Sequence, residues 1–378
     1  MTDSAPPRRP GPVRGHSRNT TRIVVPLAAG LVLAGCGPSP VDMVEHPVTT
    51  TPSRMAGEEL QRSAEPEEAC APGPVPAQFP GAGEREVSSV GPGDDRVEVP
   101  RSPERVLALG AAAVDVACAL GLQDLVVGTS GLPLDADTYL PRPLVDLPVV
   151  PASDVVAPED AAAAARDLSP DVIVLAAAED RDPSVVRALS EVAPTVVYDS
   201  DVPDWADATE AISDAYGRPR VGGDLLLDVI DRARATDAAT TPRDTQVSLL
   251  SVTGEGQDGV VVQRPDTLGS LMLEAVNARR PPAQRTRDGE RVPPAPESPA
   301  RGDELDGDVI FAVVGGGPRS EERAREAFGT DRWQDLDAVR ARRNFVVDRA
   351  VWEGAGPVAA RAVLEDITES INGIAPDG

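Results

Sequence analysis

The stretch "RVLALGAAAVDVACALGLQDLVVGTS" (105–130) decides the fold, because it holds two strand signals separated by a helix signal. Its first six residues are an apolar run that ends at Gly110, which predicts a short buried strand. Val114, Cys118 and Leu122 follow at intervals of four, which places them on one face of a helix. The run "LVVGTS" then predicts a second strand. Continuously apolar strands that alternate with helices indicate a mainly parallel sheet covered on both faces.

The same alternation continues along the rest of the chain. The further runs that predict strands are "PDVIVLAAA" (170–178), "PTVVYD" (194–199), "QVSLLSV" (246–252), "GVVVQ" (259–263), "GDVIFAVV" (307–314) and "NFVVD" (344–348). An amphipathic helical region from Trp205 to about Ala238, broken once at "GRPR" (217–220), separates the first four strands from the last four. Pro357 predicts the start of a final helix, because proline is favoured at the first helical position.

Two parts of this pattern resemble each other. "PDVIVL", a helix and "PTVVYD" in the first half match "GDVIFA", a helix and "NFVVD" in the second. Either one structural unit occurs twice, or two pairs of buried strands coincide in sequence. The simpler interpretation predicts an α/β fold in which two Rossmann-like lobes are joined by a rigid helix.

The composition changes near residue 97. Residues 36–96 are rich in Pro, Gly, Glu and Ser and have no sustained apolar period, which predicts a disordered tether. The expected organisation, by residue range, is a leader (1–35), the tether (36–96), an N-terminal lobe (97–203), linking helices (204–240) and a C-terminal lobe (241–378).

The leader is typical of an exported lipoprotein. Five arginines precede an apolar run of 12 residues, Ile23 to Ala34, whereas a membrane-spanning helix needs about 20. The run ends in "LAGC" (33–36), which resembles the lipobox of bacterial lipoproteins and predicts lipidation of Cys36. The alternative is an ordinary secretory signal that contains a cysteine. Lipidation would anchor the protein on the extracytoplasmic face of the membrane.

Lipidation of Cys36 would leave Cys70 and Cys118 as a pair in an oxidising compartment. We therefore predict a disulfide between them, and the alternative is two unrelated buried thiols. The formal net charge is −26, and the mature chain is more negative because the leader is basic. This charge argues against nucleic acid as a partner.

Histidine is absent from the part of the chain that is predicted to fold, since the only two are His16 and His46. Its absence argues against an imidazole-bound zinc site and against nucleophilic catalysis of the Ser-His or Cys-His type. Asp/Glu pairs could still act as acid and base, but among 62 acidic residues no given pair is informative. We therefore expect a binding protein rather than an enzyme, without a resident cofactor.

Several stretches resemble one family of known proteins. They are "SPERVLALGAAAVDVACALGLQDLVVG" (102–128), "LSPDVIVL" (168–175), "LSEVAPTVVYDS" (189–200) and "VWEGAGPVAARAVLEDI" (351–367). Together they resemble the iron-siderophore/vitamin B12 class (class III) of ABC-transporter substrate-binding proteins. The cysteine placement and "RPPAQR" (280–285) are similar to actinobacterial iron-citrate-type lipoproteins. The resemblance implies a periplasmic-binding-protein-like fold, a ferric siderophore in a cleft between two lobes, a permease partner and a monomer.

Five residues are candidates for the ligand site. Gly110 opens a helix after the first strand, so that amides there point outward. Tyr139 follows the second strand and is a candidate for ligand packing or hydrogen bonding. Trp352, in the loop before the last helix, is a candidate for stacking on a flat ligand, the alternative being a half-buried loop anchor. Arg264 and Arg285 are candidates for pairing with an anionic chelate, the alternatives being a solvated side chain and a mobile loop.

The expected function is that of a receptor that binds a ferric siderophore and presents it for iron uptake. Heme is the alternative ligand, with arginines on its propionates and Tyr139 as axial ligand. A cell-envelope scaffold that retains the binding fold is the alternative of a different class. Glu159 and Glu297 fit the family's pair of permease-docking glutamates poorly.

Overall fold

A computed structural model describes most of the chain after residue 65. The described residues are 66–90, 96–133, 136, 139–152, 156–177, 183–240, 245–253, 259–285 and 302–371. The expected leader, the lipidation site Cys36 and the candidate Glu297 lie outside them. No helix within these ranges is long and apolar enough to cross a membrane.

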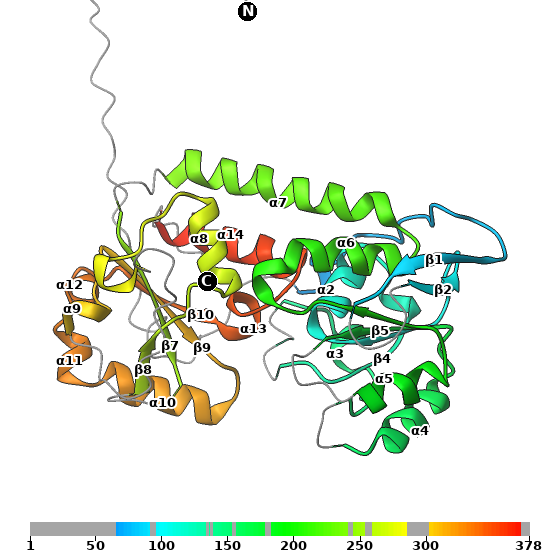
Figure 1. Ribbon diagram of the computed structural model, residues 1–378. Coiled ribbons are helices and arrows are strands. Elements are labelled where there is room, and N and C mark those ends of the chain that lie inside the picture. The colour runs from blue at the N-terminus through cyan, green and yellow to red at the C-terminus, as the bar shows by residue number, and fades with distance from the viewer. Residues whose placement is uncertain are drawn as a thin grey trace, which may run out of the picture. The chain divides into compact units, whose positions relative to one another are not determined.

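The N-terminal lobe is built on a four-stranded parallel sheet (Figure 1). Its strands, in the order β4-β3-β5-β6, are β3 (Val106–Leu109), β4 (Val126–Thr129), β5 (Val172–Ala176) and β6 (Thr195–Tyr198). Each lies where the apolar runs predicted it. Sequence-adjacent side chains point to opposite faces of a strand, and those of β3, β5 and β6 accordingly divide between two separate apolar cores.

Helices cover both faces of this sheet. The helices of the lobe are α2 (Ala111–Ala119), α3 (Arg142–Val145), α4 (Pro158–Leu168) and α5 (Pro183–Ser190), and a short 3₁₀ turn is η2 (Gln123–Leu125). Helix α2 shares one core with Val106 and Ala108 of β3, and α4 and α5 share the other with Leu107. The two-sided cover explains why the strands read as continuous apolar runs rather than as alternating ones.

The C-terminal lobe has a second four-stranded sheet, in the order β10-β9-β7-β8. Its strands are β7 (Val247–Val252), β8 (Val260–Val262), β9 (Val309–Val314) and β10 (Asn344–Asp348), and β8 alone among them runs antiparallel. The helices are α8 (Leu268–Ala275), α9 (Gly302–Leu305), α10 (Pro318–Phe328), α11 (Asp331–Gln334), α12 (Asp337–Arg340) and α13 (Arg349–Trp352), with the 3₁₀ turn η7 (Pro282–Gln284).

The two lobes repeat one unit. Numbered within each lobe, both sheets have the strand order 2-1-3-4. A carboxylate before the third strand also performs the same task in both: Asp171 accepts the backbone N–H of Glu104 and Arg105, and Asp308 accepts that of Gln246. The second strand differs in direction because the segment from β7 to β8 is shorter than the dozen or so residues that a parallel crossover needs.

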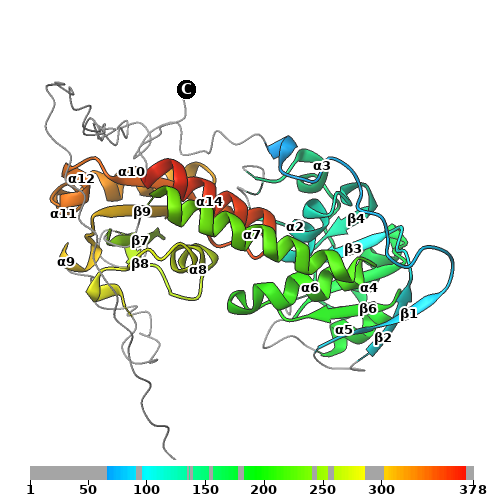
Figure 2. The same ribbon diagram turned by 90° about the horizontal axis from the view of Figure 1, so that it is seen from above.

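Long helices connect the lobes. They are α6 (Trp205–Ala215) and α7 (Pro219–Thr240), preceded by the 3₁₀ turn η4 (Val202–Asp204). The predicted break between them lies at Gly217, which has a positive φ of 80° and would place a Cβ atom 2.7 Å from the Arg101 carbonyl. The final helix, α14 (Pro357–Ile371), lies beside α7 (Figure 2), where the hydroxyls of Thr236 and Thr368 are 3.0 Å apart.

The prediction of a disordered tether is wrong for residues 66–90. Residues 66–90, here called the strap, contain the 3₁₀ turn η1 (Pro66–Glu68) and β1 (Glu84–Ser88), and β1 pairs with β2 (Arg96–Pro100) as a hairpin. Val87 of the strap is buried in the core of the N-terminal lobe, and polar contacts attach the strap to distant elements. The Arg85 guanidinium binds Asp214 at the end of α6, and the Arg218 Nε donates to the Val75 carbonyl.

The disulfide between Cys70 and Cys118 is confirmed, and it joins the strap to α2. Backbone hydrogen bonds continue the attachment, from the Ala71 N–H to the Cys118 carbonyl and from the Val75 N–H to the Leu120 carbonyl. Cys118 has no exposed surface, so the bridge is part of the core of the N-terminal lobe. The strap is therefore part of the folded lobe rather than of a tether.

Candidate ligand-binding site

Three strand ends of the N-terminal lobe meet at Gly110. Its φ of 146° is strained for any residue with a side chain. A Cβ atom there would lie 2.2 Å from the Tyr198 hydroxyl at the end of β6 and 2.9 Å from the Ala176 Cβ at the end of β5. Glycine therefore lets α2 begin directly at the carboxyl edge of the sheet, where ligands of open α/β sheets bind.

Tyr139 is not available to a ligand in this structure. The residue is 3% exposed and belongs to the apolar core that α2 shares with the sheet. Tyr139 lies in this core just before the short helix α3, which begins at Arg142. Tyr139 would have to leave the core before it could coordinate an iron, so the structure does not support its role as an axial ligand.

A polar cluster lies at the carboxyl ends of β7, β9 and β10 in the C-terminal lobe. Arg349 directly follows β10, and its Nη2 donates to the carbonyl of Val252 at the end of β7. The Glu353 carboxylate lies 3.6 Å from the Arg349 Nε and accepts a 2.9 Å hydrogen bond from the Gln263 amide. Gly315, at the end of β9, leaves room for the guanidinium, since a Cβ there would lie 3.2 Å from Nη1.

The Arg349 cluster, defined as Gln263, Arg349 and Glu353, presents a fixed guanidinium at this edge, and Glu353 partly balances its charge. The Arg349 side chain is 33% exposed, so it is both held by protein groups and accessible to solvent. A guanidinium offers donors in a planar fork that matches carboxylates and other paired oxygens. The cluster can therefore bind an anionic, oxygen-rich ligand.

Arg264 lies elsewhere on the lobe than strand-end reasoning predicts. Because β8 runs antiparallel, its carboxyl end lies beside the earlier part of β7, and the Gln263 N–H donates to the Leu249 carbonyl. The Arg264 side chain is 61% exposed and forms two hydrogen bonds with Asp266, which raise the pKa of the guanidinium. Its charge is thus partly neutralised within the lobe.

Arg285 is exposed, and its Nε donates to the Arg280 carbonyl. Arg280 itself reaches into the lobe, where its guanidinium donates to the Gln284 side chain, to the Ser270 hydroxyl and to the Leu249 carbonyl. Desolvation lowers the pKa of Arg280 to about 10. Arg280 therefore attaches this loop to β7 and α8, whereas most of the expected positive patch (279–301) lies outside the described residues.

Trp352 is not a loop residue, and the expectation that it stacks on a ligand is corrected by its burial. It ends α13, has no exposed surface and packs on Phe311 of β9 with ring centroids 4.7 Å apart. Its indole N–H donates to Asp366 of α14 at 2.8 Å. A Cβ at Gly269 of α8 would lie 2.4 Å from the ring, so the site is filled. Trp352 joins three elements as a core residue.

The Gly-rich turn before α10 has the geometry of an ordinary helix N-terminus. Gly317 has a positive φ of 90°, and Pro318 occupies the first position of α10. Nowhere in the described part of the chain do three or more His, Cys, Asp or Glu side chains converge as a metal site.

Comparison with known proteins identifies the family to which this chain belongs. The periplasmic binding protein family matches residues 106–350, which span both lobes and the helices between them. The chain belongs to the periplasmic binding protein family. Its two repeated lobes, joined by α6 and α7, are the architecture that this family membership predicts.

Individual relatives are distant. A probable siderophore-binding lipoprotein, YfiY of Bacillus subtilis, is 23% identical over 285 residues, which are 71% of this chain and 82% of the relative. Staphylococcus aureus SirA in complex with staphyloferrin B superposes with a TM-score of 0.56 at 19% identity, covering 76% of this chain and 98% of SirA. A siderophore periplasmic binding protein from the fuscachelin gene cluster of Thermobifida fusca has a TM-score of 0.56 at 22% identity, covering 73% and 99%. At these identities the solved structures establish the fold alone.

Arg349 is a candidate site residue that the sequence interpretation did not name. It directly follows the predicted strand "NFVVD", which is the position where parallel strands deliver ligand-binding side chains. The sequence signal for Arg349 is therefore its place directly after a predicted parallel strand.

Proposed function

We propose that this protein is an extracytoplasmic receptor that binds a ferric siderophore between its lobes and delivers it to an ABC-transporter permease. Membership of the periplasmic binding protein family supports the binding role. The observation that carries the ligand class is the Arg349 cluster, a cation held at a strand edge of a strongly acidic molecule. Ferric siderophores present the oxygen-rich, often anionic surface that such a cation recognises.

The location follows from the leader. Lipidation at Cys36 would anchor the protein to the outer face of the membrane. The folded part of the acidic mature chain would extend from this anchor into the aqueous phase as a monomer. Glu159 is exposed in the first turn of α4, which suits a docking role on the N-terminal lobe. The permease partner is part of this proposal.

A titration tests the proposed function. Ferric complexes of citrate, a hydroxamate siderophore and a catecholate siderophore are added to the purified protein, and tryptophan quenching gives the Kd of each. We expect at least one complex to bind well below the micromolar range, and Arg349→Gln to weaken it about 10- to 100-fold by removing a charged hydrogen bond.

Arg340→Gln is the matched control. Arg340 pairs with Asp335 and Asp337 near the amino end of β10, so its loss should leave affinity unchanged. Binding of heme with no binding of ferric siderophores would replace the proposed ligand. Absence of any binding would favour a scaffold that retains the fold.

A further inference from the structure

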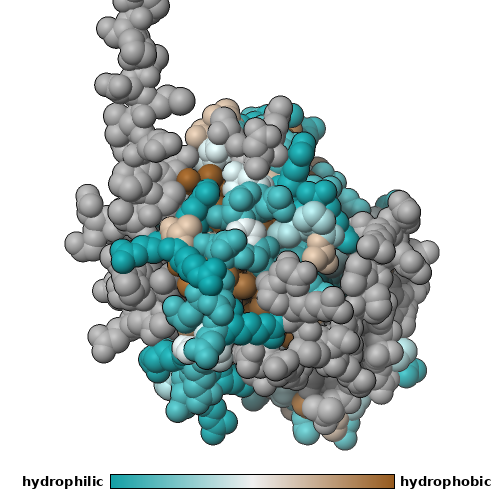
Figure 3. All heavy atoms as spheres, turned by 90° about the vertical axis from the view of Figure 1, so that its left-hand side faces the viewer, coloured by the Kyte–Doolittle hydropathy of each residue, from teal (hydrophilic) through white to brown (hydrophobic). Residues whose placement is uncertain are grey.

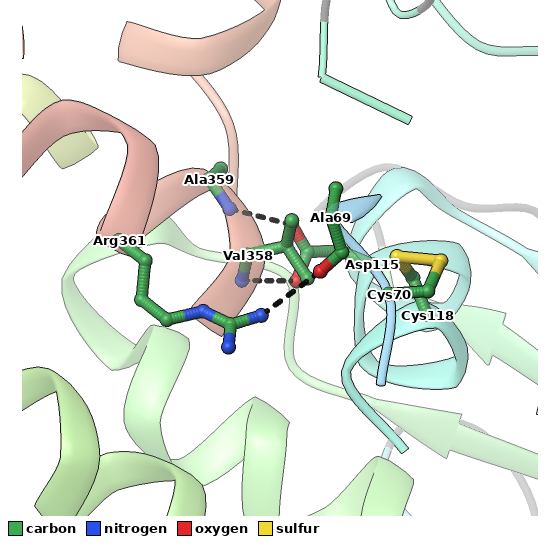
Figure 4. The surroundings of a disulfide bond; sticks show 7 residues. All are labelled: Ala69, Cys70, Asp115, Cys118, Val358, Ala359 and Arg361. Carbon is green, nitrogen blue, oxygen red and sulfur yellow. Dashed lines mark hydrogen bonds between the residues drawn. A yellow bond between two sulfur atoms is a disulfide. The ribbon is translucent and has the colours of Figure 1, made fainter. Parts of the chain in front are cut away.

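A buried carboxylate joins the two halves of the molecule. Asp115, in the second turn of α2, has no exposed surface, and its two oxygens accept the backbone N–H groups of Val358 and Ala359 at 2.8 and 2.9 Å (Figure 4). Because Pro357 has no N–H, these are the first two donors of α14. Asp115 therefore caps a helix that lies 243 residues further along the chain.

The other side of this contact is shaped to fit the carboxylate. A Cβ atom at Gly356 would lie 2.3 Å from both Cγ and Oδ1 of Asp115, so only glycine permits the approach. Arg361, one turn into α14, attracts the same carboxylate, and its Nη2 also donates to the Ala69 carbonyl. Ala69 precedes Cys70, which is bonded to Cys118 on the helix that carries Asp115. Two separate links thus hold α2 against α14.

The contact between Asp115 and the start of α14 connects the sheet edge at Gly110 with the sheet edge at the Arg349 cluster. Helix α2 begins at Gly110, at the carboxyl edge of the first sheet. Helix α14 begins just after Glu353, which holds Gln263 and Arg349 at the edge of the second sheet. Along the chain, the two edges are separated by the long path of α6 and α7. The contact of Asp115 with the start of α14 is a short polar connection between them.

We propose that Asp115 is a positioning residue for the ligand site: by holding the start of α14, it sets the place of the Arg349 cluster relative to the Gly110 edge. It contacts no ligand itself. The affinity part of this inference rests on the proposed function, whereas its geometric part does not.

A matched pair of variants tests the geometric part without any ligand. Asp115→Asn keeps the size of the side chain but replaces one acceptor by a donor that faces a backbone N–H. Asp306→Asn makes the same change at a carboxylate that accepts the N–H of Asp337 and Ala338 within one lobe. Spin labels on Asp167→Cys of α4 and Glu322→Cys of α10, both exposed positions, report the distance between the lobes.

We expect Asp115→Asn to broaden or shift the interlobe distance distribution and Asp306→Asn to leave it as in the parent protein. Gly356→Ala should reproduce the effect of Asp115→Asn, because its Cβ disturbs the same contact from the opposite side. The double variant should then add little to either single change, as expected for residues that act as one unit.

Affinity for the ferric chelate identified by titration is the second readout. Asp115→Asn and Gly356→Ala should each weaken binding about tenfold at a temperature where they remain folded, whereas Asp306→Asn should not. An unchanged distance distribution in Asp115→Asn and Gly356→Ala would overturn the inference, and so would a changed distribution with unchanged affinity. If the parent protein binds no chelate, the proposed function fails, and the distance measurement alone decides for or against the positioning role.

Discussion

At the scale of single residues, Asp115 shows how a buried charge reveals itself in the pH dependence of stability. Desolvation raises the pKa of Asp115 from 3.8 to about 6, although the two backbone hydrogen bonds and Arg361 act in the opposite direction. A carboxyl with a raised pKa in the folded state binds its proton more tightly folded than unfolded. Its contribution to stability is therefore complete below about pH 4 and is lost as the pH rises through 6.

The corresponding prediction concerns Asp115→Asn, which cannot titrate. Between pH 7 and pH 5 the free energy of unfolding of the parent protein should rise relative to that of the variant by about 1.4 kcal/mol, the value expected for this shift. Urea denaturation of both proteins at the two pH values measures it. Equal pH dependence in the two proteins would mean that the carboxyl is hydrated in solution.

At the scale of elements, the strap is held at two ends by different chemistry. Near Cys70 it depends on the disulfide and on the N–H groups of Ala71 and Val75. Near β1 it depends on Arg85, which binds the Asp214 carboxylate and the carbonyl of Ala215. The two attachments are therefore expected to open independently of each other.

Removing each attachment in turn tests this independence. Cys70→Ser with Cys118→Ser opens a loop with a sequence separation of 48 residues, which should reduce the free energy of unfolding by about 4 kcal/mol. Amide hydrogen exchange should then increase at residues 69–75 and stay slow in β1. Arg85→Gln should give the reverse pattern. Simultaneous loss of protection along the whole strap in both variants would contradict two separate attachments.

The elements also show what the sequence could predict. All eight strands of the two sheets follow from apolar runs bounded by Gly, Pro or polar residues, because those signals are local. The folded structure of the strap could not be predicted in this way, because it depends on partners more than 120 residues away along the chain. Arg85 binds Asp214, and the Gln78 N–H donates to the Gly217 carbonyl. The direction of β8 was likewise not foreseen, although the shortness of its connection contained that information.

The same distinction applies to the candidate site. Gly110 could be placed from the end of a predicted strand, and the structure leaves it at that edge. Trp352 could not, because the four-residue helix α13 turns its ring inward onto Phe311. Arg264 lies away from the expected edge because β8, the strand that precedes it, runs antiparallel to β7. Positions directly at parallel strand ends, such as Gly110 and Arg349, therefore carry a local sequence signal, whereas side chains placed by short helices or by strand direction do not.

At the scale of the whole molecule, charge opposes the proposed ligand. The formal net charge is −26, and all 36 basic residues are arginines. Figure 3 shows that the visible side bearing α11 and α12 is mostly hydrophilic where it is coloured, with a few hydrophobic residues among the hydrophilic ones. Under the proposed function, an anionic chelate would therefore approach a repulsive molecule and be attracted at close range by the Arg349 cluster.

Salt should separate the two effects, because it screens the long-range field more than a contact at the cluster. The Debye length falls from about 30 Å at 0.01 M salt to about 8 Å at 0.15 M. We therefore expect the association rate of an anionic ferric chelate to rise with salt, opposite to the usual behaviour of an electrostatically steered ligand. Stopped-flow tryptophan quenching measures this rate, and a neutral ferric trihydroxamate complex is the control that should show no trend.

Arg349→Gln then distinguishes the local attraction from the global field. Loss of this cation should mainly raise the dissociation rate, because a held, short-range donor acts after encounter. The salt dependence of association should remain, since one charge changes little in a molecule with a net charge of −26. An association rate that falls with salt in the parent protein and becomes flat in Arg349→Gln would show instead that the cluster steers the ligand from a distance. In that case the Arg349 cluster, rather than the net charge, would govern how the ligand arrives.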